Sequence, residues 1–232
     1  MKKTIAIAIA SVATTLLAGC GNNPPVPDWQ MNAHSSIERA TSAYMSGNSR
    51  VEAAEAKRAR EALASTGKID LIIRAELVQC AARVASLVFE DCAGYDKLAQ
   101  DAGPTDRAYA AYLAGRATTT DTPLLPTQHQ PIAAITASTA AAADAGAVQA
   151  IADPLSRLVA SGVLLRAGKA SPLLLADAVE TASAQGWRRP LLAWLGVQAM
   201  RAEQAGDSAE AQRIKRRIDI VAGKHAEIKT LK

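Results

Sequence analysis

The segment Ala205-Gly206-Asp207-Ser208-Ala209-Glu210-Ala211 carries the clearest helix-boundary signals in the chain. Gly206 is expected to end one helix, because glycine is favoured just past a helix C-terminus. Asp207 can cap the next helix, and Glu210 completes a capping box three residues later. Beyond the turn, apolar residues recur at helical spacing, at Ala211, Ile214, Ile218 and Val221. The stretch therefore predicts two helices joined by a tight turn.

A turn of the same plan lies near the start of the chain. Gly47-Asn48 is expected to end a helix over 29–45, and Ser49 is expected to cap the next helix in a box with Glu52. Gly206-Asp207 followed by Glu210-Ala211 resembles the turn of a tetratricopeptide repeat, where the small alanine lets two helices pack closely. The resemblance implies an all-α fold, with antiparallel helical hairpins stacked as a short repeat-like α-solenoid.

Composition and periodicity agree with an all-helical chain. Aromatic residues make up 3% of it, alanine dominates, and the β-branched runs typical of strands are nearly absent. The segment 71–89 is apolar nearly all round and should be a central helix. Further helices are expected at 106–115, 132–145, 147–167 with a restart at Asp153-Pro154, 172–184, and from Leu191 onward. A Thr- and Pro-rich loop at about 117–131 interrupts them and should be mobile or functional.

The first twenty residues indicate export. Lys2 and Lys3 precede the apolar run 5–17, which is too short to span a bilayer but fits a secretory signal peptide. Leu17-Ala18-Gly19-Cys20 resembles the lipobox of bacterial lipoproteins. The resemblance implies that residues 1–19 are cleaved off and that Cys20 carries lipid, which attaches the protein to a membrane.

Residues 20–28 are rich in Pro, Asn and Gly and predict a flexible tether. Residues 29–232 should then form a single helical domain. Position 21 is Gly rather than the Asp that retains enterobacterial lipoproteins in the inner membrane. By that resemblance the protein is expected at the outer membrane, on its periplasmic face.

Two cysteines remain after Cys20. Cys80 and Cys92 are an even pair, and an oxidising compartment favours a disulfide between them. A straight helix would hold them too far apart, so the bridge requires a turn near 89–94. Zinc is the alternative, but further His or Cys ligands are missing nearby.

Charge points to a second candidate feature at the C-terminus. The whole chain has a net charge of +4, which drops to +2 without Lys2 and Lys3 and gives no reason to expect nucleic-acid binding. The segment from Arg213 to Lys232 contains seven basic and two acidic residues. Arg213, Arg216 and Arg217 are therefore candidates for contact with an anionic partner. The alternative is a solvated terminal helix that caps the solenoid.

Arg188 and Arg189 are further candidates for partner binding. They lie beside Trp187 and close to Trp194, and exposed Trp with Arg is typical of interface anchors. The alternative is that both tryptophans belong to the core.

Motifs for catalysis and metal binding are not found. His34, His129 and His225 lack a second ligand at metal-binding spacing, and the sequence contains no HExxH, GxSxG or phosphate loop. We therefore expect no catalytic residues, no metal, no cofactor and no small-molecule substrate. Two functions stay open: a non-catalytic interaction or scaffold module that binds envelope proteins, and an enzyme or accessory factor that acts on peptidoglycan.

Overall fold

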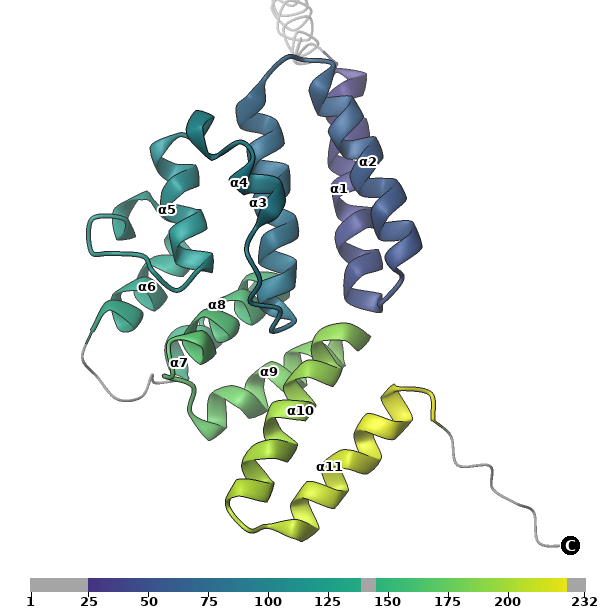
Figure 1. Ribbon diagram of the computed structural model, residues 1–232, viewed down its shortest axis with the longest axis vertical. Coiled ribbons are helices and arrows are strands. Elements are labelled where there is room, and N and C mark those ends of the chain that lie inside the picture. The colour runs from purple at the N-terminus through teal and green to yellow at the C-terminus, as the bar shows by residue number, and fades with distance from the viewer. Residues whose placement is uncertain (1–24, 139–144, 225–232) are drawn as a thin grey trace, which may run out of the picture.

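The computed structural model describes residues 25–138 and 145–224 and confirms an all-helical, repeat-like array (Figure 1). Its helices are α1 (Asp28–Ser46), α2 (Ser49–Ala64), α3 (Ile69–Ala85), α4 (Ala93–Asp96), α5 (Pro104–Leu113), α6 (Gln130–Ala137), α7 (Gly146–Gln149), α8 (Pro154–Arg166), α9 (Pro172–Ala184), α10 (Arg188–Gln204) and α11 (Ser208–Val221). Successive helices pack on each other at both ends of the chain. The predicted signal peptide, Cys20 and His225 lie outside the described residues.

Both predicted hairpin turns are present. Gly47 and Gly206 have positive φ angles of 86° and 76°, a left-handed conformation that glycine adopts without strain. Asp207 Oδ1 accepts the backbone N–H of Glu210 at 3.0 Å, as predicted. The cap of α2 differs from the prediction: Asn48, rather than Ser49, accepts the backbone N–H of Val51. Asn48 occupies the same place after its glycine as Asp207 does, so the two turns are more alike than the sequence suggested.

Helix α3 is the central helix, as its apolar surface predicts. It packs against α1, α2, α5 and α8, and its buried side chains join the main core. The helix is shorter than expected and ends at Ala85 rather than at Phe89. Leu87 has a φ of 60°, which ends helical geometry and turns the chain back along α3.

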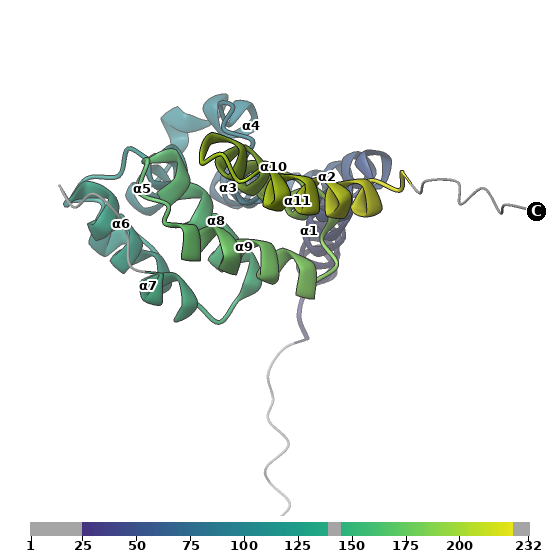
Figure 2. The ribbon, with the colours of Figure 1, turned by 90° about the horizontal axis from the view of Figure 1, so that it is seen from below.

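Two contacts fix the C-terminal half on α3. A Cβ atom at Gly162 of α8 would lie 2.4 Å from the carbonyl oxygen of Val84, so this crossing requires glycine. Trp194 of α10 is fully buried, and its indole N–H donates to the carbonyl of Ala85 at 3.0 Å. Figure 2 shows the result from below: α6 and α7 lie at one end of the molecule and α11 at the other.

The segment 117–131 is more ordered than the predicted loop. It contains two short 3-10 helices, Thr122–Leu124 and Thr127–His129. His129 is 2% exposed, and its Nδ1 lies 3.0 Å from the hydroxyl of Tyr112 in α5. Burial lowers the pKa of His129 from 6.5 to about 4, although the charge of Asp153 opposes the shift. The segment is therefore pinned to the core through a neutral histidine.

The Ala-rich helix predicted over 132–145 is also shorter. Helix α6 ends at Ala137, and Ser138 is extended. Lys169 binds this end, because its ammonium group donates to the carbonyls of Ile135, at 2.7 Å, and Ser138. A cation at the C-terminus of a helix satisfies carbonyls that have no partner within the helix. Residues 139–144 lie outside the described part of the chain.

Ion pairs join the first hairpin internally and to α3. Glu55 of α2 contacts Arg39 of α1 at 3.0 Å and also contacts Arg58. Burial raises the pKa of Glu55, but hydrogen bonds and charges from these arginines outweigh it, so the pKa lies below its usual value. Two further pairs, Glu52–Arg83 and Arg60–Glu76, link α2 to α3.

In the part of the chain that the structure describes, no helix is both long and apolar enough to cross a bilayer.

Candidate functional site

Arg188 and Arg189, adjacent at the start of α10, each bind the C-terminal end of another helix. Arg188 donates to the carbonyls of Val221 and Ala222, both at 3.0 Å, at the end of α11. Arg189 donates to the carbonyl of Tyr44 at 2.8 Å, near the end of α1, and its guanidinium lies 4.2 Å from the centre of the Tyr44 ring. Both arginines thus make contacts within the fold, whatever else they bind.

The two tryptophans beside these arginines differ in burial. Trp194 lies wholly in the core, which agrees with the core alternative for this residue. Trp187 is partly buried and packs against the edge of the same core. Neither side chain stands out from the surface as an interface anchor would.

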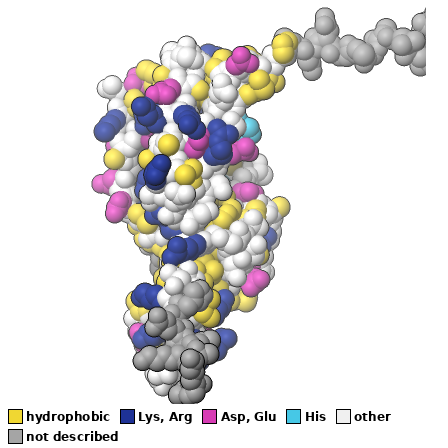
Figure 3. Space-filling view, turned by 90° about the vertical axis from the view of Figure 1, so that its right-hand side faces the viewer, with side chains coloured by type: hydrophobic (Ala, Val, Ile, Leu, Met, Phe, Trp, Pro, Cys, Tyr) yellow, Lys and Arg dark blue, Asp and Glu magenta, His cyan; other side chains and the backbone are white. Residues whose placement is uncertain are grey.

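The basic residues of α11 fall into two groups. Arg213 forms a two-fold ion pair with Glu210, with nitrogen–oxygen distances of 2.6 and 2.7 Å, and Lys215 pairs with Glu203 of α10. Arg216 and Arg217 make no hydrogen bond or ion pair with any described residue. In Figure 3, which views the molecule from the right-hand side of Figure 1, Lys and Arg side chains are spread along this face rather than gathered in one patch. Arg216 and Arg217 are therefore the basic candidates of α11 that remain available to a partner.

A groove runs between α9, α10 and α11, with a volume of about 520 Å³; we call it the C-terminal groove. Its apolar lining comes from Leu175, Val179, Ala202 and Ile214. Its charged lining residues are Arg201, Arg213, Arg217, Glu180, Asp207 and Glu210. The structure thus brings Arg213 and Arg217 together at one groove, and Arg216, Arg188 and Arg189 do not line it.

Sequence reasoning missed the α9 side of this groove. Leu175 and Val179 stand one helical turn apart, a spacing that any packed helix shows, so no sequence signal marks them as groove residues. Arg201 was missed as well. Its guanidinium donates to the carbonyl of Ala170 at 2.9 Å, which holds the loop before α9.

Cys80 and Cys92 form the predicted disulfide, with their Cα atoms 5.7 Å apart. The turn that makes it possible lies at Ser86–Leu87, a few residues before the expected position. No group of three or more His, Cys, Asp or Glu side chains in residues 25–138 and 145–224 could hold a metal ion.

The described histidines lie apart from the C-terminal groove. His34 is exposed on α1, 3.3 Å from Glu38 of the same helix. His129 is enclosed by Tyr109 and Tyr112, whose ring centres lie 5.9 and 4.9 Å from its own. A general base must reach substrate, and the burial of His129 prevents that in this conformation.

Comparison with known proteins adds no family: no protein-family model matches the chain, and neither a search of curated proteins nor a search of solved structures gave a match.

Proposed function

We propose that this protein is a lipid-anchored lipoprotein of the outer membrane that acts on the periplasmic face as a non-catalytic scaffold and binds an envelope protein in the C-terminal groove. Lipid on Cys20 holds it to the membrane, and residues 20–28 act as the tether. The stacked hairpins present the groove in the manner of tetratricopeptide repeats.

The observation that carries this proposal is the lining of the C-terminal groove. Its apolar floor would bury side chains of a bound segment, and its charged rim would fix the orientation of that segment. Helix α11 has four basic and two acidic side chains, and Arg216 and Arg217 make no hydrogen bond or ion pair with the described residues, although the charge of Arg217 helps to lower the pKa of Glu210. The groove lining is balanced in charge, with three basic and three acidic side chains, so the positive excess of α11 lies on its exposed face beside the groove. Charge complementarity at that face favours a partner with an acidic segment.

The anchor is tested by changing Cys20 to Ala in the full-length protein. We expect loss of metabolic labelling by radioactive palmitate and release of the protein from the membrane fraction. The matched control replaces Cys80 and Cys92 with Ala, which removes the other two cysteines and should leave labelling intact. Labelling that persists in the Cys20 variant would exclude lipid attachment at this residue.

The groove is tested by cross-linking in living cells through a photoreactive residue at Gln198, which lines the groove from α10. We expect capture of one or two defined envelope proteins and loss of this capture in the double variant Arg216→Glu/Arg217→Glu. The control Arg50→Glu/Lys97→Glu makes the same change of charge at exposed positions outside the groove and should leave capture unchanged. Capture of peptidoglycan in place of a protein would contradict the scaffold and favour the wall-acting alternative.

A further inference from the structure

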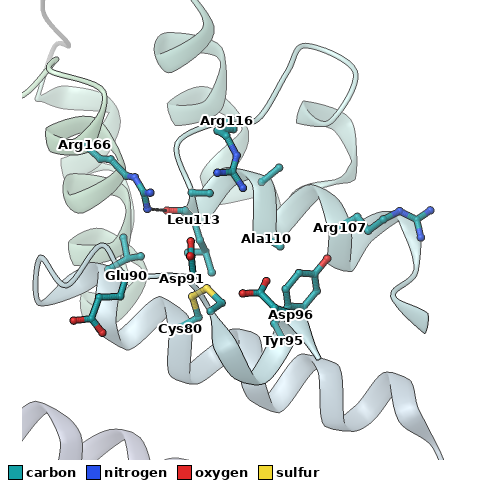
Figure 4. A pocket seen from close by; sticks show the side chains of 14 residues that line it. Cys80, Glu90, Asp91, Tyr95, Asp96, Arg107, Ala110, Leu113, Arg116 and Arg166 are labelled. Atoms are coloured by element: carbon teal, nitrogen blue, oxygen red, sulfur yellow. Dashed lines mark hydrogen bonds between the residues drawn. A yellow bond between two sulfur atoms is a disulfide. The ribbon is translucent and has the colours of Figure 1, made fainter. Parts of the chain in front are cut away.

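A second hollow lies beside the disulfide, between the segment 90–96 and helices α5 and α8 (Figure 4). Its volume is about 240 Å³, smaller than that of the C-terminal groove. Figure 4 shows the carboxylates of Asp91 and Asp96 pointing into it on one side and the guanidinium groups of Arg116 and Arg166 on the other. The hollow therefore has an acidic wall and a basic wall.

The two walls do not neutralise each other. No ion pair within 4.0 Å joins either aspartate to either arginine, although such pairs occur elsewhere in the described residues. Two negative and two positive charges thus face one small space without direct contact. A ligand that carries both charges can reach both walls at once, whereas a simple anion or cation meets attraction from one wall and repulsion from the other.

The backbone of the acidic wall and the side chain of Arg166 in the basic wall are held in place by the fold. Asp91 precedes Cys92, which is bonded to Cys80 of α3, and Asp96 follows in the short helix α4. On the basic side, Arg166 donates to the carbonyl of Leu113 at 3.4 Å. The Arg166 guanidinium also lies 5.5 Å from the centre of the Phe89 ring. Groups positioned in advance lose less entropy on binding, which favours affinity for a small ligand.

We propose that this hollow binds a small zwitterion of the amino-acid class: a free amino acid, or an unblocked amino-acid end of a short peptide. The ammonium group of the ligand contacts Asp91 and Asp96, and its carboxylate contacts Arg116 and Arg166. A planar guanidinium suits a carboxylate because it can donate two parallel hydrogen bonds. The small volume limits the ligand to about one or two residues. This site is separate from the C-terminal groove and does not depend on the proposed scaffold function.

The test is calorimetric titration of the full-length protein with alanine, dialanine, N-acetylalanine and alaninamide. We expect alanine or dialanine to bind, and about tenfold weaker binding or none for the two blocked compounds, because each lacks one of the two charges. Alanine and dialanine distinguish a free amino acid from a peptide end. Equal binding of the blocked compounds, or no binding of any of the four, would overturn the proposal.

Variants locate the site. We expect Asp91→Asn/Asp96→Asn and Arg116→Gln each to weaken binding by about tenfold. The matched control is Lys57→Gln/Glu61→Gln, which removes one positive and one negative charge from an exposed pair on α2, outside the hollow. This control should bind as the unchanged protein does. Glu90 and Arg107 also line the hollow but point away from its centre in Figure 4, so they are left unchanged. Circular dichroism confirms that each variant is folded, and unchanged affinity in the folded aspartate variant would contradict the assignment.

Discussion

The first hairpin, α1–α2, and the last hairpin, α10–α11, share a turn but differ in how their charges are used. In both turns a glycine with positive φ is followed by a side chain that accepts a backbone N–H three residues later, from Asn48 in one and from Asp207 in the other. In the first hairpin, Glu55 is paired internally and Glu52 is paired with α3. In the last, Lys215 pairs with Glu203 across the hairpin, whereas Arg216 and Arg217 of α11 make no ion pair with a described residue.

One local sequence pattern therefore occurs in two different surroundings. The turn residues set the angle between two helices in either place, because their contacts are all within a few residues. The elements that pack against each hairpin determine whether its charged side chains form ion pairs within the fold or remain free to bind a partner. Helix α2 packs against α3, whereas α11 packs mainly against α10 and leaves one side open to the C-terminal groove.

The largest effect tests the core that anchors the last hairpin. We expect Trp194→Ala to lower the free energy of unfolding by about 4 kcal/mol, because a fully buried indole and its hydrogen bond to Ala85 are lost. Urea unfolding followed by circular dichroism measures this. Trp187→Ala is the control and should cost less, since Trp187 is only partly buried. Equal losses would mean that α10 is not fixed on α3 through Trp194.

His129, in the segment between the two hairpins, should make the stability of the protein depend on pH. Its pKa is about 4 in the folded protein and 6.5 when unperturbed, so the unfolded state binds the extra proton between these values. The contribution of His129 to the free energy of unfolding is therefore fully present above pH 6.5. It falls by about 3 kcal/mol as the pH drops to 4. Urea unfolding at a series of pH values measures this slope.

The control for the histidine is His129→Gln, in which the slope above pH 4.5 should disappear whatever the absolute stability. Carboxylates such as Glu55, with a pKa below 4.5, lose their contribution only at lower pH. A slope that survives in His129→Gln would place the titrating group elsewhere.

The adjacent arginines allow a direct comparison of the two hairpins. We expect Arg189→Ala to cost about 1–2 kcal/mol, because it loses two hydrogen bonds and its contact with the Tyr44 ring. Arg188→Ala should cost about 1 kcal/mol, since its contacts are exposed. Hydrogen exchange should increase at the end of α1 in the first variant and at the end of α11 in the second. Increases in the opposite places would contradict the two contacts.

The smallest effect is expected at Arg216. Arg216→Glu should change the free energy of unfolding by less than about 0.5 kcal/mol, because this exposed side chain makes no hydrogen bond or ion pair with the described residues. The same change in the first hairpin, Arg39→Glu, places an acidic group beside Glu55 and should destabilise the protein clearly. Thermal unfolding of both variants tests this, and equal destabilisation would remove the distinction between the hairpins.

Local patterns predicted the helical class, both hairpins and the central place of α3. The bounds of α9 agree with the prediction because Pro172 begins this helix. The disulfide was also predictable, since Cys80 and Cys92 were an even pair after Cys20. The helices and turns depend on residues close together in the sequence, and the disulfide follows from the number of cysteines.

Contacts between distant segments were not predictable. The segment 117–131 is ordered because His129 hydrogen-bonds to Tyr112. The end of α6 is held by Lys169, which donates to the carbonyl of a residue 34 positions earlier in the chain. At the C-terminal groove, the sequence singled out Arg213 and Arg217 by charge alone. It gave no sign of the α9 wall, because a helix face that lines a groove has the same apolar spacing as one that packs in a core.

The contact between Arg189 and Tyr44 has a consequence for the order of folding, because 145 residues separate the two. Helical hairpins form fast from local contacts, whereas a contact this distant must wait for the chain between them to fold. The end of α1 therefore stays uncovered until α10 arrives. An α10 from a second molecule presents the same arginine, so at high protein concentration we expect refolding to yield some domain-swapped dimer.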